Sequence, residues 1–157
     1  MNDFLHAVML EAVQHAVDHV EAGGIPFVGA VVQDERVLSP FGVNIVHETG
    51  DPTAHAEIVA MRDALAAADQ SVLSGAALLA TGEPCGMCYK HAIRWGITDI
   101  YVAIDRDTVA SLGFDYRASY PAFGISEARR TSLYHSLRVP GDLEPFTRFL
   151  NRHAIRT

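Results

Sequence analysis

The sequence predicts a three-layer α/β domain that spans residues 1–157. Four short apolar runs are typical of strands, at 28–32, around 37–46, at 76–80 and at 98–104. Segments with the apolar spacing of helices alternate with these runs. With 157 residues, 49% of them hydrophobic, the chain is long enough to form one domain with a sizeable core.

The first helix is expected between Asp3 and Ala22, where apolar side chains recur at helical spacing until Gly23-Gly24 ends the pattern. The buried strand at 28–32 follows. Residues 33–36, Gln-Asp-Glu-Arg, are typical of a hairpin turn, and they lead into the strand at 37–46.

A second helix is expected over 54–67, after a loop at 47–52. Asp51 or Thr53 is the expected cap of this helix, and Pro52 suits its first turn. The chain therefore passes from the first pair of strands into a helix.

The third strand, at 76–80, is followed by a short helix over 85–95 and by the fourth strand at 98–104. After Asp105 the pattern weakens. We expect a loop-rich stretch through Gly124, a helix over 126–137 and a better defined helix over 143–153, with the helices covering both faces of a sheet.

The charge balance disfavours nucleic acid as a partner. The net charge is −7, from 19 acidic and 12 basic side chains, and Lys90 is the single lysine. Phosphate-binding surfaces need several convergent cations. No run approaches the roughly 18 to 20 apolar residues that cross a bilayer, and the first residues lack the features of a secretory signal. We expect a cytoplasmic protein without a membrane partner.

The run GEPCGMC contains both cysteines of the chain, Cys85 and Cys88. A Cys-x-x-Cys pair that follows a strand and opens a helix has the position of a redox dithiol. It is also half of a structural zinc site, although such a site needs two further ligands. The pair alone leaves redox, metal-binding and inert roles open.

A third ligand is indicated by the triplet His55-Ala56-Glu57, which opens the predicted helix at 54–67. Helix starts at neighbouring strand ends meet where α/β folds build their active sites. His55, Cys85 and Cys88 would leave one tetrahedral position open for water, which is the arrangement of a catalytic zinc. Glu57 is close enough to act as a general base and then as a general acid.

The two motifs together match the zinc deaminase signature, H-x-E followed by P-C-x-x-C. From about Phe4 to Phe149 the chain resembles the cytidine deaminase superfamily. The resemblance implies a three-layer α/β/α fold with a central mixed five-stranded sheet, and a homodimer. It also implies Zn²⁺ on the three ligands and Glu57 as the proton shuttle.

Substrate contacts follow partly from the resemblance. It implies that Asn44, a turn residue by sequence pattern alone, holds the base, helped by backbone groups near Ala56 and Cys85. From their position before and in the first strand, Phe27 and Val28 are candidates for an apolar wall of the pocket, with core packing as the alternative.

Local stretches distinguish the branches of the superfamily. Residues 23–27, GGIPF, resemble fungal-type cytosine deaminases, whereas residues 105–116 and the C-terminal LEPFTRFLNR resemble guanine deaminases. DPTAHAE is shared by guanine and tRNA adenosine deaminases. We expect a free-nucleobase deaminase, with guanine first and cytosine second. The alternatives are a tRNA adenosine deaminase and, from another class, a non-catalytic zinc-binding interaction domain.

Two departures from guanine deaminases concern base recognition. Tyr116 stands where those enzymes have a second aspartate, and Asp115 is the candidate to replace it. For the ring of Tyr116, stacking on the substrate and packing in the protein core are equal alternatives. The last residues, 154–157, lack the aromatic that guanine deaminases can use to close the pocket. Another amino-substituted ring is therefore also a candidate substrate.

Overall fold

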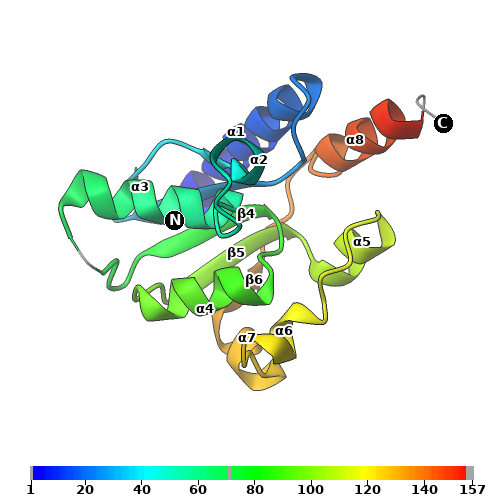
Figure 1. The fold of residues 1–157 in the computed structure, drawn as a ribbon. Coiled ribbons are helices and arrows are strands. Elements are labelled where there is room, and N and C mark those ends of the chain that lie inside the picture. The colour runs from blue at the N-terminus through cyan, green and yellow to red at the C-terminus, as the bar shows by residue number, and fades with distance from the viewer. Residues whose placement is uncertain (1, 71, 155–157) are drawn as a thin grey trace.

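The computed structural model describes residues 2–70 and 72–154, so the C-terminal departure noted above lies largely outside the described residues. They form a mixed sheet with helices on both faces (Figure 1). The strand order is β2-β1-β4-β5-β6, and β3 also pairs with β1. Among the described helices, none combines the length and the apolar composition needed to span a bilayer.

The sheet is antiparallel at one end and parallel at the other. β1 (Val28–Gln33) pairs antiparallel with β2 (Arg36–Val37), β3 (Gly42–Val43) and β4 (Ala77–Gly82). β5 (Asp99–Ile104) runs parallel to β4, and β6 (Tyr134–Ser136) runs parallel to β5. The mixed sheet implied by the family resemblance is confirmed.

Alternating side chains of the central strands point to two separate cores. Val31, Leu78 and Ile100 pack with α3 (Ala56–Ala68) and α4 (Gly86–Arg94). Ala30, Leu79 and Ala103 pack on the other face with α1 (Asn2–Glu21) and with Phe146 of α8 (Glu144–Ala154). The predicted three layers therefore follow from the period-two alternation of buried strands.

The predicted hairpin turn at 33–36 is confirmed, since Gln33 pairs with Arg36 and both turn residues have positive φ. The single strand predicted at 37–46 is wrong. It is split into β2 and β3, and the break contains Pro40, which has no backbone N–H to donate to a sheet.

The predictions around the second helix need correction. The expected loop at 47–52 contains the short helix α2 (Val46–Thr49). His55, and neither Asp51 nor Thr53, is the N-cap of α3, and its side chain makes no capping hydrogen bond. Asp51 instead accepts hydrogen bonds from the backbone N and the Oγ1 of Thr53, at 2.9 and 2.6 Å, and Pro52 lies before the helix.

The region after β5 is more ordered than its pattern predicts. α5 (Arg106–Ser111), capped by the side chain of Asp105, and α6 (Ser119–Ala122) lie in the expected loop. The helix predicted over 126–137 is correct only for α7 (Glu127–Leu133), because Tyr134 is extended and begins β6. This last strand was not predicted, since three residues are too short for a period to show.

Candidate active site

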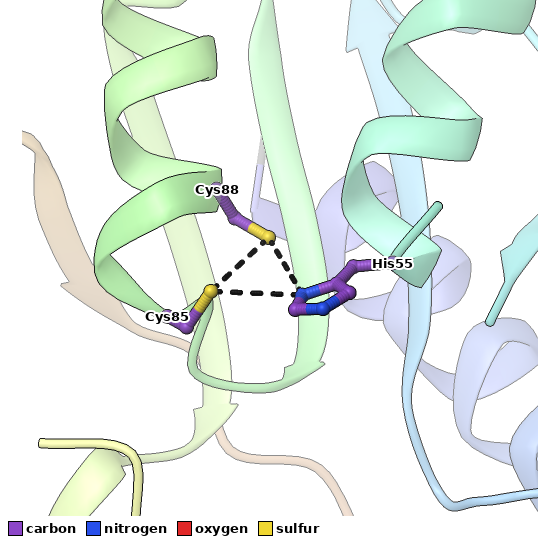
Figure 2. A group of neighbouring side chains, drawn as sticks. All are labelled: His55, Cys85 and Cys88. Atoms are coloured by element: carbon purple, nitrogen blue, oxygen red, sulfur yellow. Dashed lines mark hydrogen bonds between the residues drawn. The ribbon is translucent and has the colours of Figure 1, made fainter. Parts of the chain in front are cut away.

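The two predicted motifs meet at the ends of two helices. His55 is the N-cap of α3, and Cys85 is the N-cap of α4, just beyond β4. Figure 2 shows the imidazole of His55 directed at the two sulfur atoms. His55 Nδ1 lies 3.6 Å from Cys85 Sγ and 3.5 Å from Cys88 Sγ, and the sulfur atoms are 3.6 Å apart.

These separations fit one zinc ion. Zn–S bonds of about 2.3 Å and Zn–N bonds of about 2.0–2.1 Å at tetrahedral angles place two sulfurs roughly 3.8 Å apart, and sulfur and nitrogen roughly 3.6 Å apart. The observed values lie within a few tenths of an ångström of both. A disulfide needs about 2.05 Å between the sulfurs, and both cysteines are free. The geometry favours the metal interpretation over the redox one.

The protonation of the ligands reflects their burial and contacts. The pKa of Cys85 is lowered to about 4, chiefly by its hydrogen bond with Cys88 and then by that with His55. Burial raises the pKa of Cys88, and the hydrogen bond with Cys85 raises the pKa of His55. Of the two cysteines, Cys85 is therefore the one that ionises more readily.

Glu57 lies in the first turn of α3, two residues after His55, and its side chain is buried. Burial and, to a lesser extent, the charge of Cys85 raise the pKa of Glu57 to about 7. A carboxylic acid with such a pKa exchanges a proton near neutral pH, as a general acid–base group must.

Two glycines bring the start of α3 against the sheet. A Cβ on Gly42 of β3 would lie 2.3 Å from the carbonyl oxygen of Ala56. A Cβ on Gly29 of β1 would lie 2.9 Å from the Cα of Glu57. Only glycine permits this approach, so both residues position the acidic side chain. They were not predicted, since a glycine in a strand signals a close approach without naming its neighbour.

A cavity of about 210 Å³ opens at this cluster. Phe27, Phe114 and Tyr116 form its aromatic walls. The ring centroid of Phe27 lies 5.1 Å from that of Phe114 and 6.2 Å from that of Tyr116, and both pairs of rings meet edge to face. The residues that line it are Ile25, Phe27, Asn44, His55, Ala56, Glu57, Glu83, Cys85, Phe114 and Tyr116. Such a narrow aromatic space suits a flat ring.

Four of the predicted substrate contacts, Asn44, Ala56, Phe27 and Tyr116, line the cavity, and two, Val28 and Asp115, do not. Val28 is not among its lining residues. It is buried in the core on the α1 side, and its N–H donates to Thr81 Oγ1 at 3.0 Å. Asp115 is exposed, and its carboxylate is held by the guanidinium of Arg117 at 2.8–2.9 Å, which lowers its pKa to about 2.

Ile25, Phe114 and Glu83 line the cavity without having been predicted to do so. The carboxylate of Glu83 is fully buried and accepts four hydrogen bonds. Two come from the guanidinium of Arg130, at 2.6 and 2.9 Å, one from Tyr89 Oη at 2.8 Å and one from the backbone N of Arg106 at 2.9 Å. The position of Glu83 directly before Pro84-Cys85 was the one signal in the sequence that could have indicated a role at the site. Its hydrogen-bond partners are distant in sequence, so no local pattern reveals them.

An open three-ligand metal site beside a buried glutamate, at the end of a narrow aromatic cavity, defines the class of zinc-dependent hydrolytic deaminases. Comparison with protein families agrees. The family described as the cytidine and deoxycytidylate deaminase zinc-binding region matches residues 3–104, and the chain belongs to this family.

Individual relatives are similar over most of the chain. The guanine deaminase of Bacillus subtilis is 32% identical over 142 residues, which are 89% of this chain and 90% of that protein. Its crystal structure has a TM-score of 0.68 and covers 91% of both chains. A solved complex with 8-azaguanine has a TM-score of 0.76 at 26% identity, over 94% of this chain and 82% of that one.

A tRNA-specific adenosine deaminase from Aquifex aeolicus is 39% identical over 96 residues, which are 60% of this chain and 63% of that protein. The similarity to this second kind of deaminase is therefore higher locally and covers less of the chain.

Proposed function

We propose that the protein hydrolytically deaminates a small free nucleobase or a related amino-substituted heterocycle, with guanine as the first candidate and cytosine as the second. The observation that carries this proposal is the cluster of His55, Cys85 and Cys88, which meets Glu57 at one narrow aromatic cavity. The choice of guanine is supported by the 32% identity to a guanine deaminase over 89% of the chain. The choice of cytosine is supported by GGIPF alone.

In this proposal His55, Cys85 and Cys88 hold zinc. When bound, zinc supplies a Lewis acid that lowers the pKa of a water molecule to about 7. Glu57 accepts a proton from water on a carboxylate oxygen and delivers it to the exocyclic nitrogen of the ring. A C–O bond replaces the C–N bond, and ammonia leaves. A pKa of about 7 on Glu57 allows both proton transfers near neutral pH.

The remaining lining residues orient the ring. Asn44 Oδ1 accepts a hydrogen bond from the backbone N of Val46 at 3.1 Å, so its amide nitrogen is the part that can donate to a ring acceptor. Ala56, at the start of α3, adds backbone groups. The rings of Phe27 and Tyr116 then enclose the base.

A tRNA adenosine deaminase is the second candidate, favoured by the 39% identity to such an enzyme. That similarity covers 60% of the chain, against 89% for the guanine deaminase. The net charge of −7 and the single lysine also oppose binding to an RNA backbone.

A non-catalytic zinc-binding interaction domain is the alternative from another class. The buried Glu57 argues against this alternative, because a structural zinc site does not need a group that carries protons beside it.

The proposal also includes a single domain, a homodimer and a cytoplasmic location. Light scattering coupled to gel filtration tests the homodimer.

Ammonia release from a panel of substrates tests the proposed function. The panel contains guanine, cytosine, adenine, cytidine, other amino-substituted heterocycles and a tRNA anticodon stem. We expect turnover of one or more free bases and none of the RNA. Reaction of the RNA alone would overturn the free-base proposal, and no reaction of any member by zinc-loaded protein would favour the interaction domain.

A further inference from the structure

The loop that carries Cys85 is held by a segment that follows it by about thirty residues. We call residues 83–86 the ligand loop and residues 116–120 the tyrosine segment. The hydroxyl of Tyr116 donates to the carbonyl oxygen of Glu83, and the hydroxyl of Tyr120 donates to that of Pro84, at 2.5 Å. The two carbonyl groups directly before the metal ligand thus each accept a tyrosine hydroxyl.

The two segments also touch along their backbones. The backbone N of Gly86 donates to Ser119 Oγ at 2.8 Å, and the same hydroxyl donates to the carbonyl oxygen of Tyr116 at 2.6 Å. A Cβ on Gly86 would lie 2.3 Å from the carbonyl oxygen of Ser119. The glycine between the two cysteines is therefore required by the packing of the tyrosine segment.

The ligand loop depends on these contacts because of its position in the fold. Cys88 lies within the first turn of α4 and is fixed by the helix, whereas Cys85 is the N-cap, where helical backbone geometry begins. Glu83 and Pro84 are buried, and buried carbonyl groups need donors. Among the described residues, the two tyrosine hydroxyls are the donors to these two carbonyl groups. Without the tyrosine segment, both hydrogen bonds would be lost and not replaced.

We propose that Tyr116, Ser119 and Tyr120 are positioning residues for the metal site, because they hold Cys85 where it meets Cys88 and His55. Tyr116 has two separate tasks. Its ring forms a wall of the cavity, while its hydroxyl serves the ligand loop and not the substrate. The inference depends on the zinc ligands and is independent of which base is deaminated.

Two conservative variants of the zinc-loaded protein test the proposal. Tyr116→Phe and Tyr120→Phe each remove one hydroxyl and keep the ring. We expect each to weaken zinc binding about 10- to 100-fold in competition with a chelator, which is the usual effect of losing an outer hydrogen bond at a metal site. The absorption bands of the Co²⁺-substituted protein should shift as well, because the position of the Cys85 thiolate changes.

Asp142→Asn is the matched control for a loss of stability alone. Asp142 is buried and does not line the cavity. Its carboxylate accepts hydrogen bonds from the guanidinium of Arg138 and from the backbone N of Val139. We expect this variant to unfold at a lower urea concentration than the wild type. Its zinc affinity should stay within twofold of the wild-type value, and its Co²⁺ spectrum should not shift. If the tyrosine variants keep wild-type zinc affinity, or lose no more of it than Asp142→Asn does, the proposal is overturned.

The KM of the reacting base, measured at saturating zinc, separates positioning of the metal ligand from contact with the substrate. We expect Tyr120→Phe, whose ring is not among those that line the cavity, to leave KM within about threefold of wild type while zinc affinity falls. A rise in the KM of Tyr116→Phe with unchanged zinc affinity would instead assign that hydroxyl to the substrate and would overturn the proposal. Zinc affinity needs no substrate, so this outcome is distinct from a failure of the substrate panel.

Discussion

The buried ion pair between Arg130 and Glu83 gives the sharpest prediction about stability. Arg130→Ala would leave the Glu83 carboxylate, which is 0% exposed, without its charged partner. Breaking a buried pair from one side costs about 3–5 kcal/mol, since an uncompensated charge remains. Tyr89 and the backbone of Arg106 still donate to this carboxylate, so we expect the lower end, about 3 kcal/mol.

Arg148→Ala is the matched control. Arg148 bonds to two glutamates, Glu21 and Glu144, but these side chains are 42–46% exposed. Exposed pairs contribute little to stability, because water and salt screen them. The same substitution should therefore cost much less here, although more carboxylates are involved. Burial, and not the number of ion pairs, decides the order.

Urea unfolding of the zinc-loaded proteins, followed by circular dichroism, measures both losses. The double variant Glu83→Gln/Arg130→Met should recover part of the stability, because it leaves no buried charge without a partner. Equal losses in Arg130→Ala and Arg148→Ala would refute the reasoning. So would a double variant that is less stable than Arg130→Ala.

Two further predictions concern the proposed chemistry. Glu57→Gln should retain one zinc per chain by metal analysis but lower kcat by about 10²- to 10⁴-fold, the usual contribution of a general acid–base group, and a fully active variant would remove Glu57 from the mechanism. Zinc affinity should fall as the pH is lowered from 8 to 6. The pKa of Cys88 is raised by burial and that of His55 by the bond with Cys85, so protons compete with the metal for both ligands as the pH falls. Chelator competition at pH 6, 7 and 8 measures this, and a flat profile would contradict it.

The zinc-site motifs could be predicted because their meaning is local. His55-Ala56-Glu57 and Cys85-x-x-Cys88 each combine ligand or acid–base chemistry with the start of a helix, and helices and strands are visible in hydrophobic periodicity. Short apolar runs likewise predicted the strands, and the alternation of these runs with helical segments predicted the layers. Where an element was too short to show a period, as in β3 and β6, the prediction was wrong or absent.

Contacts between distant segments were decided only by the tertiary structure. Asp115 and Tyr116 are adjacent in sequence, yet one is exposed beside Arg117 and the other lines the cavity and donates to Glu83. Val28 and its neighbour Phe27 both pack in the core on the α1 side, yet only Phe27 also lines the cavity.

By itself, then, the sequence determined the family, the metal ligands and the order of most elements, because these depend on residue type at short spacing. The tertiary structure decided which side chains form the wall of the cavity and which segment holds the ligand loop. Those outcomes depend on where segments distant in the sequence meet, as Phe27 and Phe114 do at the cavity, and no local pattern records that.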